Sequence, residues 1–129
     1  DISAGVTYDT SALVAAERGD RRMWSLHAGY LAEEVVPVVP APVLAQAWRG
    51  GPRQALLARL LAMCDVEPLS EGYARQVGVL IGKSANADVV DATVVEGAVR
   101  RRDAIVTSDA ADLRRIAAAV KASLRFEVI

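Results

Sequence analysis

This sequence has little of two residue types on which whole classes of protein depend. Its 129 residues include one cysteine, Cys64, and one histidine, His27. A single cysteine permits no internal disulfide, which fits the reducing cytoplasm. A single histidine leaves none to spare for a Ser-His or Cys-His catalytic pair, and we expect His27 to pack on the inner face of a helix.

Long apolar runs are also missing. No window reaches the roughly 18 uninterrupted apolar residues of a membrane span, and the best candidate, 35–48, is interrupted by three prolines. The start of the chain has no basic segment ahead of an apolar one, so no secretory signal is expected. We therefore expect a cytoplasmic protein with no membrane partner; because the chain starts with Asp1, its native N-terminus stays open.

The composition is that of a folded domain. Hydrophobic residues make up 53% of the chain and aromatic residues only 5%, so aliphatic packing should dominate the core. The length fits one domain spanning residues 1–129. Disorder is not expected from this balance of apolar and charged residues.

Short apolar segments alternate with helical patterns along the whole chain. Strands are expected at 5–9, 35–40, 66–69, 104–107 and 125–129, and helices at 11–18, 21–34, 42–48, 53–64, 71–81, 88–101 and 109–122. Alternation without hairpin signals predicts a mostly parallel sheet covered on both faces. The expected fold is α/β, a three-layer α/β/α sandwich with a four- to five-stranded sheet.

Acidic residues gather around this sheet. Asp9 and Asp109 each follow a strand, where parallel α/β sheets carry their ligand sites. Asp88 and Asp91 lie three apart on one helix face, and Asp112 follows Asp109 by three. Each could simply cap or begin a helix, except Asp91, which sits among valines with no obvious basic neighbour. Carboxylates meeting there would favour a bound divalent cation.

The charge outside this cluster has the opposite sign. Of 16 acidic residues, five lie in the cluster, and the other 11 stand against 15 basic ones, mostly arginine. An acidic pocket on a mildly basic body suits a metal-dependent enzyme that acts on a polyanion, although an ordinary mixed surface explains the numbers equally well.

Residues 8–13, YDTSAL, continue an expected strand into Asp–x–Ser, and residues 87–92, ADVVDA, begin the acidic helix. Asp91 precedes Asp109 by 18 residues, and residues 107–113, TSDAADL, contain a hydroxyl–x–Asp pattern. These three segments and this spacing together resemble the PIN domain, in particular the VapC-type ribonuclease toxins of bacterial toxin–antitoxin pairs. They are similar to the family's strand–Asp–x–Ser start, its acidic helix, the separation of its last two core acids and its hydroxyl–x–Asp ending.

This resemblance implies a Mg²⁺- or Mn²⁺-dependent endoribonuclease. Asp9, Asp91 and Asp109 would be the catalytic metal ligands, and Asp88 and Asp112 are further candidates for metal binding. Ser11, Gln46 and Thr107 would contact and orient these ligands without binding the metal themselves. It also implies structured RNA such as tRNA as substrate, products with 3′-hydroxyl and 5′-phosphate ends, a homodimer, and a cognate VapB-type antitoxin. Which RNA is cut, at which position, and with one or two metal ions, the sequence leaves open.

One position departs from the family pattern. The helix after the second strand usually carries a Glu, and the corresponding residue here is Gln46. An amide offers a carbonyl oxygen but no charge, so a hard cation loses part of its attraction. An alternative is therefore a non-catalytic PIN domain that binds RNA or protein. A response-regulator-type phosphoryl domain is a weaker alternative, because the first strand lacks paired acids and Lys121 lies in a helix.

Four arginines are candidates for binding substrate phosphates. Arg49 lies one turn beyond Gln46, and Arg100, Arg101 and Arg102 end the acidic helix. Arginine binds phosphate through paired N–H donors. Basic residues at a helix end also complement the helix dipole without any ligand, so this role is open.

Overall fold

The computed structural model describes residues 5–129, and its centre is a sheet of five parallel strands. These are β1 (Val6–Tyr8), β2 (Val38–Pro40), β3 (Asp65–Glu67), β4 (Ala104–Thr107) and β5 (Phe126–Val128). Their order across the sheet is β3-β2-β1-β4-β5, and every neighbouring pair is parallel. The predicted α/β sandwich with a four- to five-stranded parallel sheet is confirmed.

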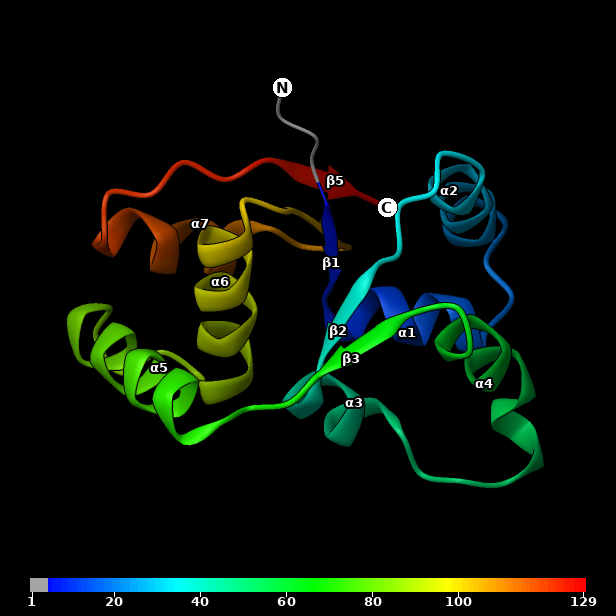
Figure 1. Ribbon diagram of the computed structural model, residues 1–129, viewed down its shortest axis with the longest axis horizontal. Helices are drawn as coiled ribbons and strands as arrows, with labels where there is room; N and C mark the ends of the chain where they lie inside the picture. The colour runs from blue at the N-terminus through cyan, green and yellow to red at the C-terminus, as the bar shows by residue number, and fades with distance from the viewer. Residues whose placement is uncertain (1–4) are drawn as a thin grey trace.

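Helices cover both faces of this sheet, as Figure 1 shows. One layer holds α1 (Thr10–Glu17), α2 (Arg21–Ala32) and α4 (Ala55–Leu61), and the other holds α5 (Glu71–Lys83), α6 (Val89–Arg101) and α7 (Ala111–Ala119). The short α3 (Ala41–Ala47) follows β2 and contacts both α1 and α6. None of these helices is long and apolar enough to cross a membrane.

Strand β1 lies at the middle of the sheet, and its position follows from its sequence. Val6, Thr7 and Tyr8 are at most 2% exposed. Strands buried on both faces need apolar side chains throughout, or polar ones that are paired. Thr7 meets this requirement, since its hydroxyl donates to Asp103 at 2.8 Å.

The two neighbours of β1 are reached by connections running in opposite directions. The chain moves outward through β2 to β3 on one side, then crosses to β4 and β5 on the other. Open α/β sheets bind ligands at such a switch point, beyond the carboxyl ends of the strands. Residues directly after β1 and β4 therefore occupy the favoured place for a site.

Several elements are shorter than their sequence patterns predicted. The helix expected at 53–64 begins as a 3₁₀ turn, η1 (Pro52–Gln54), and its α-helical part ends at Leu61. The last helix starts at Ala111, because the Asp109 carboxylate accepts the backbone N–H of Ala111 and occupies the turn before the helix. Strand β2 starts only at Val38, after Pro37, which has no N–H to donate to a neighbour.

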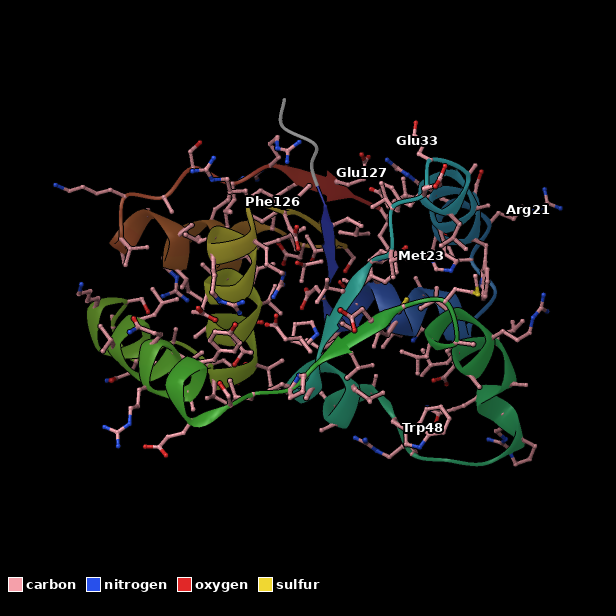
Figure 2. All side chains as sticks on the ribbon, in the orientation of Figure 1. Arg21, Met23, Glu33, Trp48, Phe126 and Glu127 are labelled. Atoms are coloured by element: carbon pink, nitrogen blue, oxygen red, sulfur yellow. The ribbon has the colours of Figure 1, made fainter. Side chains whose placement is uncertain are left out.

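The interior is packed with aliphatic side chains, as the composition predicted. Met23, on the inner face of α2, is fully buried, whereas Arg21 and Glu33 at the two ends of that helix extend outward (Figure 2). His27 is only 3% exposed and lies beside Tyr8, with its Nδ1 2.8 Å from the Tyr8 hydroxyl oxygen. The expected packing role for His27 matches this position.

Candidate active site at the carboxyl edge of the sheet

Asp9 follows β1 at the switch point, and its carboxylate is fixed from several directions. Oδ1 accepts the backbone N–H of Thr10 at 2.8 Å, which makes Asp9 the N-cap of α1. Oδ2 accepts the hydroxyl of Thr107 at 2.8 Å, and the Ser11 hydroxyl lies 3.4 Å away. The side chain is 9% exposed, so these donors hold a nearly buried carboxylate in one orientation.

Ser11 and Thr107 form a small hydroxyl network that joins the ends of β1 and β4. Their hydroxyl oxygens lie 3.2 Å apart, and Ser11 Oγ also accepts the backbone N–H of Ser108 at 2.8 Å. Both residues thus contact Asp9 directly and restrict the orientation of its carboxylate.

Asp91 lies in the first turn of α6, beside other carboxylates. Its pKa is raised from the usual 3.8 to about 6, first because burial disfavours the charged form and then because Asp9, Asp88 and Asp112 repel it. Asp88 itself caps α6, since its Oδ2 accepts the N–H groups of Val90 and Asp91, each at 3.0 Å. The fold thus brings Asp9, Asp88 and Asp112, three of the other four predicted acids, close enough to Asp91 to raise its pKa.

Asp109 is not among the carboxylates that raise the pKa of Asp91. It is exposed, its Oδ1 accepts the backbone N–H of Ala111 at 3.1 Å, and its own N–H donates to Thr107 Oγ1 at 3.2 Å. Asp112, one turn further along, is the α7 acid that repels Asp91. The expected ligand role of Asp109 stays a prediction, and Asp112 is the member of the pair that acts on Asp91.

The donor chemistry fits a hard divalent cation, but the donors are not preassembled. Carboxylate and hydroxyl oxygens are the ligands that Mg²⁺ and Mn²⁺ prefer. Within residues 5–129, however, no three His, Cys, Asp or Glu side chains converge closely enough to hold a metal ion. A bound cation would therefore have to draw the carboxylates closer than they lie in this structure.

Gln46 reaches the border of this site from α3. Its Oε1 accepts the hydroxyl of Thr10 at 2.6 Å, directly beside the Asp9 cap of α1. The side chain is exposed, and within residues 5–129 its side-chain hydrogen bond is to Thr10 and not to an acid of the cluster. Gln46 therefore lies next to the Asp9 cap, and its amide contributes no charge there.

Three of the four candidate arginines, Arg100, Arg101 and Arg102, lie at the far end of α6, and two of them are already paired. Arg100 binds Glu67 at 2.7 Å and Glu96 at 2.9 Å and stacks on the Tyr73 ring, 3.6 Å from its centroid. Arg101 binds Glu67 at 2.6 Å and Asp103 at 2.9 Å.

These arginines end α6, about 14 Å along its axis from Asp91 at 1.5 Å per residue. Their backbone lies next to the start of β4, at the amino edge of the sheet, while the guanidinium groups of the first two bind Glu67, the last residue of β3. Arg102 is exposed and follows in a left-handed conformation, φ 62°. Near the site, the Arg49 guanidinium folds back onto the carbonyls of Ala45 and Trp48, at 3.2 and 2.8 Å.

Sequence reasoning missed one residue at the site. Asp91 was expected to lack a basic neighbour, yet Arg115 lies close enough to act against the rise of its pKa. Arg115 also binds Asp112, with 3.4 Å between Nη2 and Oδ1. The i,i+3 spacing of Asp112 and Arg115 was visible in the sequence, but the packing of α7 against α6 was not.

Comparison with known proteins adds the fold and nothing finer. No protein-family model and no curated protein sequence matches the chain. One solved structure that matches is the crystal structure of VapBC2 from Rickettsia felis bound to a DNA fragment from their promoter. The TM-score is 0.70, over 96% of this chain and 98% of that chain, with 16% sequence identity. This similarity confirms the predicted PIN-like fold.

Proposed function

We propose that the chain is a divalent-metal-dependent endoribonuclease of the VapC type. One observation carries the proposal: the partly buried Asp91 lies near Asp9, Asp88 and Asp112 at the switch point of the sheet, and burial, followed by repulsion from these three carboxylates, raises its pKa to about 6. A carboxylate with a strongly raised pKa at a ligand-binding edge is typical of an enzyme site.

Asp9, Asp91 and Asp109 are the proposed ligands of Mg²⁺ or Mn²⁺, with Asp88 and Asp112 able to contribute. The cation, when bound, supplies an activated water and neutralises charge on the leaving oxygen of an RNA phosphodiester, which gives 3′-hydroxyl and 5′-phosphate ends. Ser11 and Thr107 hold the Asp9 carboxylate in place. No side-chain base is needed, which agrees with the buried position of His27.

The remaining proposals concern partners. The similar structure is of a VapBC2 assembly, and we propose a VapB-type antitoxin and a homodimer for this chain as well. For the RNA backbone, Arg49 and Arg102 are the more available of the four arginines, since neither forms an ion pair within residues 5–129. A structured RNA such as tRNA is large enough to reach both. An adjacent small reading frame for a DNA-binding protein would support the antitoxin.

The direct test is cleavage of bulk tRNA in Mg²⁺ or Mn²⁺, with EDTA as the metal-free control. We expect cleavage that EDTA abolishes and that Asp9→Asn and Asp91→Asn each reduce by at least about 100-fold, the scale of losing a charge-stabilising group. Circular dichroism and Tm show whether each variant is folded. Full activity in folded Asp91→Asn would overturn the assignment.

A second function is favoured by two observations. Gln46 replaces the expected Glu, and no three donors converge in the described part of the chain. Both fit a PIN-like domain that binds RNA or protein without cleaving it. Salt-dependent tRNA binding with no cleavage at any metal concentration would establish this alternative.

A further inference from the structure

Arg115 is a basic side chain at the edge of an acidic site, and the core does not need it. It lies on α7 beside Asp112, with Nη2 3.4 Å from Oδ1. The two side chains are 55% and 70% exposed. An exposed pair at this distance contributes little to stability, and it exchanges partners readily.

The position of Arg115 is set by the packing of α7. Leu113, Ile116 and Ala117 are the buried residues of the helix, and α7 packs on α6, which carries Asp91. Through its pair with Asp112, the Arg115 guanidinium lies against one of the carboxylates that could contribute to the cation site, on the helix that packs against the one carrying Asp91.

We infer that Arg115 is a substrate-binding residue, which releases Asp112 and holds the phosphodiester of the RNA at the acidic site. The inference rests on the proposed function and deepens it, because it names the group that admits a polyanion among four carboxylates. A guanidinium can hold two non-bridging phosphate oxygens through paired N–H donors, which an ammonium cannot do in the same geometry.

The neighbouring residue provides a matched control. Arg114 has the same charge and lies on the same helix, but its guanidinium carbon sits 4.9 Å from the Phe126 ring centroid, toward β5. Phe126 is labelled on β5 in Figure 2. Arg114→Gln therefore removes the same charge from α7 and leaves the pair of Arg115 with Asp112 in place.

The test compares Arg115→Gln, Arg115→Lys and Arg114→Gln with the wild-type chain, using bulk tRNA. In Mn²⁺, we expect Arg115→Gln to raise KM at least about tenfold with a smaller change in kcat, Arg115→Lys to recover part of this loss, and Arg114→Gln to stay within twofold. In EDTA, the slope of log affinity against log salt should fall by about one in Arg115→Gln, as for one lost phosphate contact.

The outcomes separate this inference from the proposed function. Equal KM values and equal salt slopes in folded Arg115→Gln and Arg114→Gln would overturn the inference while leaving the nuclease intact. If the wild-type chain cleaves no RNA in any metal, the proposed function fails, and the binding measurement in EDTA still decides whether Arg115 contacts phosphate.

Discussion

The hydroxyl of Thr107, at the end of β4, donates a hydrogen bond of 2.8 Å to the Asp9 carboxylate at the end of β1. The two residues are 98 positions apart in the sequence and lie on adjacent strands of the sheet. This contact ties the candidate catalytic acid to the strand that leads into the second acidic segment, so the site depends on the pairing of β1 with β4.

Thr107→Val should lower both activity and stability. Valine keeps the shape of threonine, but Asp9 Oδ2 loses its shortest donor and the N–H of Asp109 loses its acceptor. We expect kcat to fall about tenfold, and the free energy of unfolding to fall by about 1–3 kcal/mol, as for buried polar groups left unpaired. Thr107→Ser, which retains the hydroxyl, should recover most of the activity. Equal losses in both variants would contradict the orienting role.

Asp91→Asn should stabilise the metal-free protein at neutral pH. The unfolded chain releases the Asp91 proton near pH 3.8. The folded chain holds this proton up to about pH 6, because burial and then repulsion from neighbouring carboxylates raise the pKa of Asp91. Stability therefore declines as pH rises from about 4 through 6, and the loss remains above 6. In EDTA, the Tm of Asp91→Asn should exceed the wild-type Tm at pH 8, and the gap should close near pH 4. A gap independent of pH would mean that Asp91 titrates normally.

His27 should contribute a pH dependence of the opposite sign. Burial lowers the pKa of His27 below its usual 6.5, and no residue of the described range 5–129 forms a hydrogen bond with its Nε2. The unfolded chain then binds more protons, so stability is lost as pH falls below about 6.5. The pH range over which His27 changes the stability overlaps the range over which Asp91 does. The effect of His27 is therefore measured in the Asp91→Asn variant, with and without His27→Gln. There, His27→Gln should flatten the change in Tm between pH 5 and pH 7.5.

Gln46→Glu should tighten metal binding. The Gln46 amide already lies beside the N-terminus of α1, where its Oε1 accepts the Thr10 hydroxyl. A carboxylate there adds negative charge near Asp9, which favours a divalent cation and raises repulsion in its absence. We expect Mn²⁺ affinity, measured by calorimetry, to rise roughly three- to tenfold, which is on the order of 1 kcal/mol. Equal affinities in the two proteins would mean that residue 46 does not face the cation.

The order of the elements and the edge that carries the acids could be predicted from the sequence. The alternation of apolar segments with helical patterns predicted the parallel sheet. Asp9 and Asp109, each within two residues of the end of a predicted strand, were therefore expected at the same edge of that sheet. The partners of Arg100 and Arg101 could not be predicted, because Glu67 lies more than 30 residues away on β3. Nor could the approach of Arg115 to Asp91, which depends on how α7 packs against α6. Sequence periodicity gives the faces of helices, and the angle between two helices depends on the side chains that interlock.

The bond between Thr7 and Asp103, described with β1, has a consequence for the site at the other end of the strand. Strand β1 is only three residues long, and two side-chain hydrogen bonds hold it beside β4. Its middle residue, Thr7, binds Asp103 just before β4, and Asp9, just after β1, binds Thr107 at the end of β4. A slip of one residue would turn every side chain to the opposite face and break both hydrogen bonds together. Arg101 donates to Thr7 at 2.9 Å and also binds Asp103. The ion pair between Arg101 and Asp103 therefore helps to fix the register of β1 against β4. A substitution of Arg101 or Asp103 would therefore displace Asp9 and reduce activity, although neither residue contacts an acid of the candidate site.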